Sequence, residues 1–295
     1  MSLIVDLGQS GARIKTNNQV VQSSIAKQAS ESVVQTLERV FKEVPTQTHE
    51  LVYLSLTGLM GDVGDVTPYG ELCAKLFDAK RVFVMDDGIA AYLGALSRSN
   101  GVVLTLGGGV VAVSGNNGKF GHADGKGAIF GDFGGGFWVG QSGMRRAIAT
   151  LDGRDDAPDL VEALKSELKQ HQELQSKTGV EASALCITAA KTVIQAAEAG
   201  SKSALQILDQ AAVYLGRTVC AAWDKVKEQN SSQPKIAFLG GLSKSDLYLK
   251  LIKTEINKSL DCEYVIAQSD HLTGAPLAAE LFPNGAPPLF KIWQR

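Results

Sequence analysis

The sequence predicts an α/β protein with two related domains. Short apolar runs of strand length alternate with amphipathic segments, which is typical of helices that cover a buried sheet. Most of the predicted strands end at glycine or aspartate, as strands that lead into tight turns do. The strand–glycine turn–strand pattern occurs twice, as IVDLGQSGARI and VLTLGGGVVAV, and this repetition suggests an internal duplication.

The first predicted domain covers residues 1–99. Apolar runs predict strands at 3–5, 12–15 and from about 20, and later strands at 51–56 and 81–85. Apolar residues at helical spacing predict an amphipathic helix at about 31–44, which Pro45 stops, and further helices near 72–77 and 88–96. The resulting order β-β-β-α-β-α-β-α is an α/β layout.

The second predicted domain covers residues 100–295, and its pattern restarts at Gly101. Strands are expected at 102–106 and 110–113, and a segment dense in glycine then leads to Asp132 and a helix from about 137. We expect a final helix to pack back on the first domain, followed by an irregular, proline-containing tail. After the glycine-rich segment we expect a helical insertion at 144–150, 160–168, 184–197 and 203–226. Strands are then expected at 235–239 and 264–267, and helices at 244–256 and 274–281, the last of which is the final helix.

Composition and charge exclude several classes of protein. The 295 residues are 44% apolar and 20% charged, which is ordinary for a soluble enzyme, and a net charge of −2 offers no basic surface for nucleic acid or anionic membrane. No apolar run is long enough to span a membrane, and no basic-then-apolar leader follows Met1. The four cysteines and four histidines lack metal-ligand spacing. We therefore expect a cytoplasmic protein with reduced thiols.

The first glycine turn follows the first strand. Asp6 could hold a hydrated Mg²⁺ there, while the amides of the turn face phosphates. The turn consists of Gly8, Gln9, Ser10 and Gly11. An ordinary hairpin turn uses the same residue types, so both interpretations remain open, and the chain has no GxxxxGK[ST] motif.

Two consecutive aspartates, Asp86 and Asp87, stand at the end of one strand and the start of a helix. In α/β proteins ligands bind at this position, although an aspartate there is often only a helix cap. Because there are two, one could cap the helix while the other accepts a proton from a substrate hydroxyl. The pair alone supports a structural role, as a helix cap, and a functional role, as a proton acceptor, equally.

Three further motifs contain consecutive glycines. Gly107, Gly108 and Gly109 join two strands, so their amides can approach an anion, and the β-branched run that follows argues against a dinucleotide-binding GxGxxA motif. In GDFGGG, the apolar neighbours of Asp132 favour a structured loop over a linker, and its carboxylate could accept two sugar-hydroxyl hydrogen bonds. The turn of Gly240, Gly241, Leu242 and Ser243 suits an adenine–ribose unit, although a simple turn is about as consistent.

The order of these motifs resembles the actin/hexokinase/Hsp70 superfamily. Within it, the chain resembles the BadF/BadG/BcrA/BcrD ATPase family, in its N-acetylglucosamine kinase-like branch. The resemblance covers nearly the whole chain and includes AAEAGSKSALQILDQAAVYLG and GAPLAA. It implies a two-domain actin-like ATPase (ribonuclease H-like) α/β fold with a cleft between duplicated domains.

The resemblance also implies a role for each motif. Asp6 would organise Mg²⁺, Asp87 would be the catalytic and sugar-contacting aspartate, and Gly127 and Asp132 would contact the sugar. The nucleotide and its phosphates would be bound by Gly8, Gln9, Ser10, Gly11, Gly107, Gly108, Gly109, Gly240, Gly241 and Ser243. The chain departs from the family patterns GTGS, GDEGS and Trp-Gly-His, where it has GGGV, GDFGG and Lys-Gly-Ala. The sugar side therefore matches less well than the nucleotide side.

The activity implied by the resemblance is a cytosolic kinase that uses ATP and Mg²⁺. Its acceptor would be a hexosamine, N-acetylglucosamine or glucosamine, phosphorylated at the 6-OH. The partners implied are this small molecule and a second copy of the chain in a homodimer, without nucleic acid or membrane. The alternative is a family member that binds sugar or nucleotide without efficient transfer, as a sensor or activator. The cysteines do not suit the iron–sulfur cluster of benzoyl-CoA-reductase-type activators.

Overall fold

The computed structural model describes residues 2–9, 11–17, 19–27, 31–45, 47–174 and 179–295. Ser10, which is predicted to bind phosphate, therefore lies outside the described residues. The chain divides into two compact units. Unit 1 comprises Met1–Val103, Val113–His122 and Tyr264–Arg295, and unit 2 comprises Leu104–Ala112 and Ala123–Glu263.

Unit 1 contains a six-stranded mixed sheet with the strand order β11-β5-β4-β1-β2-β3. Strands β1, β4 and β5 are parallel, whereas β2, β3 and β11 are antiparallel to their neighbours. The carboxyl ends of the three parallel strands therefore meet at one edge of the sheet. The strands are β1 (Ser2–Leu7), β2 (Ala12–Thr16), β3 (Gln19–Ser23), β4 (Leu51–Leu56), β5 (Arg81–Asp86) and β11 (Phe290–Gln294).

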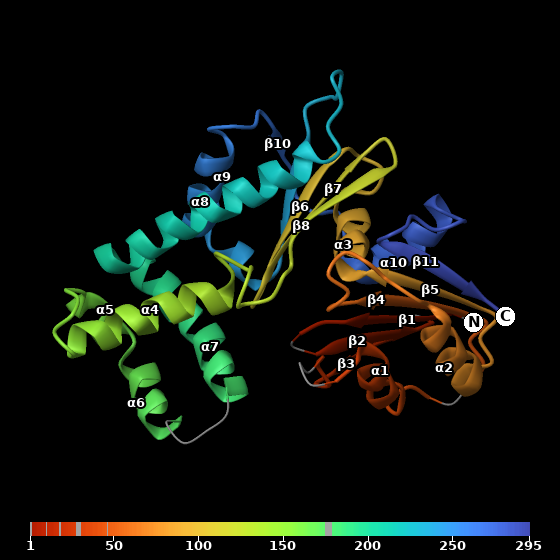
Figure 1. Ribbon diagram of the computed structural model, residues 1–295, viewed down its shortest axis with the longest axis horizontal. Helices are drawn as coiled ribbons and strands as arrows, with labels where there is room; N and C mark the ends of the chain where they lie inside the picture. Colours follow the sequence, from red (N-terminus) through yellow and green to blue (C-terminus); the bar gives the residue numbers. More distant parts are fainter. Residues whose placement is uncertain (1, 10, 18, 28–30, 46, 175–178) are drawn as a thin grey trace. The chain divides into compact units, whose positions relative to one another are not determined.

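Helices cover both faces of this sheet, with α1 and α2 on one face and α3 and α10 on the other (Figure 1). Ser32 begins α1 with a capping box, in which its hydroxyl accepts from the Gln35 amide and the Gln35 side chain accepts from the Ser32 amide. The buried face of α1 includes Leu37 and Val40, which join the core on the sheet. The helices are α1 (Val33–Phe41), α2 (Thr67–Phe77), α3 (Asp87–Leu96) and α10 (His271–Leu281).

The tail of the chain is not irregular, as the sequence predicts, but forms β11, which pairs with β5. Phe290 is completely buried and its ring centroid lies 6.3 Å from that of Phe83 on β5. On the other face of β11, Trp293 packs against the core shared with α1 and α2. Burial of these two aromatic side chains stabilises a strand that the preceding prolines make difficult to recognise in the sequence.

The second sheet has five strands in the order β10-β9-β6-β7-β8. This order repeats β5-β4-β1-β2-β3 of the first sheet, in agreement with the predicted duplication. β8 is a strand that the sequence pattern does not predict; it follows β7 through the turn residues Asn117 and Gly118, both with positive φ. The strands are β6 (Gly101–Leu106), β7 (Val110–Asn116), β8 (Lys119–Asp124), β9 (Lys235–Leu239) and β10 (Glu263–Tyr264), the last ending before the predicted 267.

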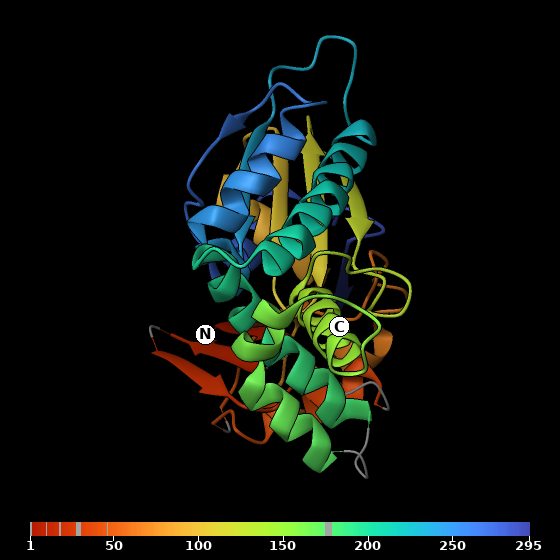
Figure 2. The ribbon, with the colours of Figure 1, turned by 90° about the vertical axis from the view of Figure 1, so that its left-hand side faces the viewer.

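The remaining helices belong to unit 2. Figure 2 shows α8 and α9 side by side over strands of the second sheet, and α4 packs closely against α7. The helix expected at 160–168 is divided, because α5 ends before Leu164 and α6 begins after it. The elements are α4 (Gly136–Leu151), α5 (Pro158–Ala163), α6 (Lys165–Leu174), α7 (Gly179–Glu198), α8 (Lys202–Asp224), the 3₁₀ helix η1 (Gly241–Lys244) and α9 (Asp246–Ile256).

Two sheets with helices packed on them confirm the predicted α/β class. Within the described ranges, no helix combines the length and the apolar character that crossing a bilayer requires.

Candidate active site

Asp6 lies near the carboxyl end of β1, between two side chains from neighbouring strands. It is paired with Arg13 of β2 in the antiparallel register and with Ser55 of β4 in the parallel one. Arg13 donates to Oδ2 of Asp6 from Nε at 3.0 Å and from Nη2 at 2.6 Å, and the Ser55 hydroxyl donates to Oδ1 at 2.8 Å. The Asp6 side chain is only 12% exposed. The sheet register thus fixes an almost buried carboxylate at this edge.

Arg13 also connects this carboxylate to the start of α10. Its Nη1 donates to Oδ2 of Asp270 at 2.5 Å, and its Nη2 lies 3.5 Å from Nδ1 of His271. Asp270 is the N-cap of α10, because its Oδ1 accepts from the Leu272 amide at 3.1 Å. Burial of Asp270 acts to raise its pKa, but the hydrogen bond from Arg13 and the positive charge of that guanidinium lower the pKa below its ordinary value. Arg13 therefore holds two carboxylates from distant parts of the sequence.

The two consecutive aspartates have different surroundings. Asp86 is buried and caps α3, since its Oδ1 accepts from the Gly88 amide at 3.0 Å, and its Oδ2 accepts from the Gly61 amide at 3.1 Å. Nε2 of His122 lies 3.8 Å from Oδ1 of the same carboxylate. Asp87 is the first residue of α3, and the residue as a whole is less buried than Asp86. Asp86 is therefore the cap of α3, and the carboxylate of Asp87 is not needed for that role.

Asp87 lies in surroundings that favour its protonated form. Burial of the carboxyl group, followed by the negative charges of Asp86 and Asp6, raises the pKa of Asp87 to about 8. A hydrogen bond with the Thr57 side chain acts in the opposite direction. A carboxyl group whose pKa lies near neutral pH, at the carboxyl edge of parallel strands, is suited to exchange a proton with a ligand.

The first glycine turn follows β1 directly. The Gly8 amide donates to the Gly11 carbonyl at 2.9 Å, which closes the turn, and the Gly8 carbonyl accepts from the Lys27 amide at 3.3 Å. The Gly8 amide is thus already used within the protein and does not face a ligand. Gly11 lies against the Ser23 carbonyl at the end of β3, so close that no side chain would fit.

The resemblance implies Mg²⁺, and Asp6 is its predicted ligand. The described part of the chain has no group of three or more aspartate, glutamate, histidine or cysteine side chains that could hold a metal ion. A carboxylate offers about four acceptor sites, and Arg13 and Ser55 occupy three of those of Asp6. Mg²⁺ in phosphate-transfer sites retains several waters and needs only one or two carboxylates. Asp6 therefore fits an ion that arrives with a nucleotide and is contacted through water.

The second glycine turn lies in unit 2 and contacts the GDFGGG loop. The carbonyls of Gly107 and Gly108 accept from the amides of Gly136 and Phe137 at the start of α4, both at 2.9 Å. These helix amides are consequently used within the protein and do not face a ligand. Among hydrogen bonds between described residues, none uses the amides of Gly108 or Gly109. These two amides are the ones in the turn that could face a phosphate.

Asp132 supports this turn. Its Oδ1 accepts from the Val110 amide at 3.1 Å, and its own amide donates to Oδ1 of Asp124 at 2.7 Å. A side chain at Gly109 would overlap the Asp132 carboxylate, which explains the glycine at that position. The residue is 5% exposed, and burial raises its pKa. Gly127 lies in the same loop, where its carbonyl accepts from the Gly131 amide at 2.8 Å.

The third glycine turn also lies in unit 2, at the end of β9. Gly240 has φ of +94°, and a Cβ atom there would lie 2.2 Å from the Leu106 carbonyl oxygen at the end of β6. Gly241 is open, with no atom within 4 Å of such a Cβ. The Ser243 hydroxyl donates to the Gly240 carbonyl at 2.8 Å. Unit 2 thus brings the Gly240–Ser243 turn next to the strand that leads into Gly107.

The structure adds Arg13, Thr57 and Asp270 to the predicted residues of unit 1. A signal for Arg13 is present in the sequence, because counting outward from the Gly8–Gly11 turn in an antiparallel hairpin places it opposite Asp6. Asp270 is more than 250 residues from Arg13 in the chain, as their separation of 257 positions shows, and sequence spacing gives no indication that they meet.

Comparison with solved structures defines the class of fold. A candidate N-acetylglucosamine kinase from Chromobacterium violaceum superposes with a TM-score of 0.70 at 22% identity, covering 94% of this chain and 97% of that one. A candidate N-acetylglucosamine kinase from Porphyromonas gingivalis gives 0.70 at 14% identity with the same coverages. A ROK family glucokinase from Streptomyces griseus, in complex with glucose and AMPPNP, gives 0.59 at 16% identity, covering 96% and 99%. The chain therefore has the actin-like ATPase fold, as predicted.

The family is shown by sequence. The model of the BadF/BadG/BcrA/BcrD ATPase family matches residues 3–279, so the chain belongs to this family. No protein with a curated description matches the chain.

Proposed function

We propose that the protein is a kinase that transfers the γ-phosphoryl group of ATP to a hydroxyl of a hexosamine. N-acetylglucosamine or glucosamine is the proposed acceptor, with transfer to the 6-OH. The observation that carries the proposal is the position of Asp87, beyond the carboxyl ends of β1 and β4 and at the end of β5, beside the capping Asp86. The structural similarity to candidate N-acetylglucosamine kinases supports the same choice of acceptor class.

Asp87 would orient the acceptor hydroxyl and accept its proton. The acceptor oxygen forms a bond to the γ-phosphorus as the bond from that phosphorus to the β–γ bridging oxygen breaks, and ADP leaves with the electrons of that bond. Mg²⁺ that accompanies the nucleotide would neutralise the phosphate charge. Asp6 would contact the water shell of this ion, and the amides of Gly108 and Gly109 would position phosphate oxygens.

The remaining glycine turns and the buried aspartate have proposed roles that follow the family resemblance. Gly240, Gly241 and Ser243 would lie against the adenosine, since Gly241 offers open backbone. Asp132 and Gly127 would contribute to the sugar site, Asp132 through the carboxylate oxygen that does not accept from Val110. We also propose that the protein is cytoplasmic and forms a homodimer. Sedimentation of the purified protein would test the dimer.

The test is an ADP-release assay with ATP and Mg²⁺ and a panel of acceptors: N-acetylglucosamine, glucosamine, N-acetylmannosamine, glucose and no sugar. We expect release that depends on an amino sugar. Asp87→Asn should lower turnover by about 10²–10⁴-fold, the usual contribution of a general base, with a smaller effect on sugar binding. Asp65→Asn is the matched control, because Asp65 also stands at a helix start, before α2, but on the surface. Normal turnover in Asp87→Asn would reject the assignment.

A second candidate is a family member that binds nucleotide or sugar without efficient transfer. The burial of Asp132 and its hydrogen bond with Val110 favour it, because a carboxylate used to support a turn is less available to a sugar. Phe133 also stands where the family pattern has glutamate. A rise in melting temperature with ATP, without ADP release, would favour this candidate. ADP release that ignores the sugar would favour an activator-type ATPase.

A further inference from the structure

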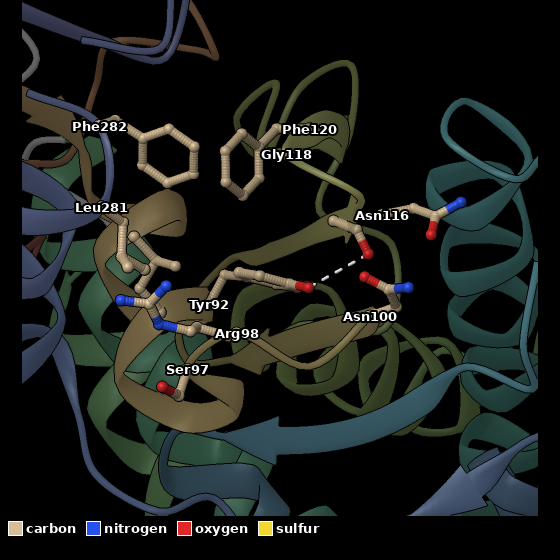
Figure 3. A pocket seen from close by; sticks show the side chains of 11 residues that line it. Tyr92, Ser97, Arg98, Asn100, Asn116, Gly118, Phe120, Leu281 and Phe282 are labelled. Atoms are coloured by element: carbon tan, nitrogen blue, oxygen red, sulfur yellow. Dashed lines mark hydrogen bonds between the residues drawn. The ribbon is translucent and has the colours of Figure 1, made fainter. Parts of the chain in front are cut away.

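A cavity of about 240 Å³ lies in unit 1, and none of the residues predicted for phosphate transfer lines it. Its walls come from three segments: the carboxyl end of α3 with the connection to β6, the β7–β8 hairpin, and the end of α10 (Figure 3). Asp87 begins α3, so the cavity lies at the opposite end of the same helix.

One wall of the cavity is aromatic. The ring of Phe120 lies 5.7 Å from that of Tyr92 and 5.2 Å from that of Phe282, at interplanar angles of 84° and 72°. The Tyr92 hydroxyl lies 2.6 Å from the Ser99 carbonyl and 3.1 Å from the Gly115 carbonyl, and its single proton is shared between these two acceptors, so this polar group is already satisfied. Figure 3 shows the rings of Phe120 and Phe282 next to each other, and Phe120 is also in edge-to-face contact with Tyr92. Such edge-to-face surroundings favour a planar aromatic ligand.

A positive charge stands at the rim. Arg98 lines the cavity, and its side chain is 72% exposed. Its ion pair with Glu280 is 3.7 Å long, which is beyond hydrogen-bond distance. A ligand carboxylate can therefore compete for the guanidinium and form the paired hydrogen bonds that arginine makes with planar anions.

The backbone around the cavity is fixed in an unusual conformation. Ser97 ends α3 with φ of +53° and ψ of −117°, which is costly for a residue other than glycine. Across the cavity, the Asn117 amide donates to Oδ1 of Asn100 at 3.2 Å and ties the hairpin to the α3–β6 connection. Strained backbone of this kind is frequent at ligand sites, and the hydrogen bond fixes the hairpin against the α3–β6 connection.

We propose that this cavity binds a small aromatic carboxylate, with the ring against Phe120 and Phe282 and the carboxylate on Arg98. The volume lies below the usual range of about 300–1,000 Å³ for small-molecule sites, so the ligand has a single ring. Binding itself is independent of the proposed kinase activity.

The location of the cavity adds an effector role, which rests on the proposed function. Every residue of α3 from Gly88 to Leu96 is buried, so the helix is held along its whole length. A ligand wedged at its carboxyl end is thus in contact with the element that positions Asp87. We infer that occupancy changes turnover rather than the affinity for ATP.

Benzoate is the probe, with benzyl alcohol as its uncharged counterpart, in titration calorimetry and thermal unfolding of the full chain. At about ten times its Kd, benzoate should raise the melting temperature by about 2–4 °C, and benzyl alcohol should bind more weakly. Arg98→Gln should weaken benzoate binding about tenfold and leave benzyl alcohol unaffected. Arg154→Gln is the matched control, since Arg154 is a similarly exposed, ion-paired arginine of unit 2.

Absence of benzoate binding by wild-type protein would overturn the proposal, as would equal binding by Arg98→Gln and Arg154→Gln. Phe282→Leu keeps an apolar side chain and should weaken the binding of both benzoate and benzyl alcohol. Unchanged affinity for the two probes would contradict the proposed contact with the aromatic wall. Binding without any effect on ADP release would overturn the effector role alone. Failure of the kinase proposal would instead appear as the absence of sugar-dependent ADP release, with benzoate binding retained.

Discussion

Arg13 donates two hydrogen bonds to one carboxylate oxygen of Asp6, at 2.6 and 3.0 Å. The pair joins the first two strands of the chain directly beside the first glycine turn. Because the Asp6 side chain is almost buried, removing its cation leaves a charge with little water to compensate it.

We expect Arg13→Gln to lower the free energy of unfolding by about 1–3 kcal/mol, the usual cost of leaving a part-buried polar group without its partner. Asp6→Asn together with Arg13→Gln should cost less than the sum of the two single changes. Urea denaturation of the four proteins measures this coupling. Strictly additive losses would mean that the pair contributes little.

Asp87 should destabilise the native protein at neutral pH. Its native pKa of about 8 exceeds the ordinary value of about 3.9 in the unfolded chain. Between these values the unfolded chain has released the proton and the native protein retains it, so stability is lost as pH rises from about 4 to 8. Asp87→Asn should therefore stabilise the protein increasingly over this window, on the order of a few kcal/mol, since one pKa unit equals about 1.4 kcal/mol. A gain that is constant from pH 4 to 8 would be inconsistent with this explanation.

The same pKa predicts the pH dependence of catalysis if the kinase proposal holds. Asp87 must be ionised to accept the proton of the acceptor, and at pH 6 most of it is protonated in the free protein. We expect kcat/KM to rise with pH through this raised pKa and to level off above it. A profile that is flat from pH 5 to 9 would indicate that another group accepts the proton.

His49 should make the protein sensitive to acid. It is completely buried, and neither ring nitrogen has a hydrogen-bond partner among the described residues. Burial lowers the pKa of His49, so the native protein binds a proton less readily than the unfolded chain, and stability falls as pH drops below about 6.5. His49→Leu should lose less of its stability between pH 7 and pH 5 than the wild type does. Parallel thermal unfolding curves at both pH values would contradict this.

Two neighbouring glycines give a matched test of the third turn. Gly240→Ala should destabilise the protein by about 1–3 kcal/mol or more, because φ is positive and the new methyl group would overlap the Leu106 carbonyl. Gly241→Ala meets no atom within 4 Å and should leave stability within about 0.5 kcal/mol. If adenosine lies against this backbone, Gly241→Ala should nevertheless raise the KM for ATP. An unchanged KM would exclude Gly241 from the nucleotide site.

Local sequence patterns predict an element well where its formation does not depend on contacts with distant parts of the chain. The strands at 51–56 and 235–239 have the predicted bounds, because short apolar runs there lie between clear breakers. β8 and β11 were not predicted, since their stability depends on pairing with β7 and β5 and on burial of distant aromatic side chains. The boundary between domains at 99 and 100 stays a prediction.

The candidate active site likewise contains residues that the local sequence indicates and residues that only distant contacts bring together. The sequence places Asp86 and Asp87 at a strand end but does not say which one caps the helix, because that depends on which side chain reaches the Gly88 amide. It also gives no indication of Asp270, which reaches Arg13 only after the chain has returned to unit 1. The roles proposed for the glycine turns remain predictions from the family resemblance.

The pairing of β5 with β11 has a consequence for the order in which the protein is made. β5 is complete early, but its partner leaves the ribosome only after the whole of 123–263 has been synthesised. Until then β5 is an open edge of mostly apolar side chains, Val82 to Met85, able to pair with other chains. During synthesis the nascent chain can therefore aggregate through this unpaired strand edge until β11 has been made. Chaperones that cover exposed strands would act in this period.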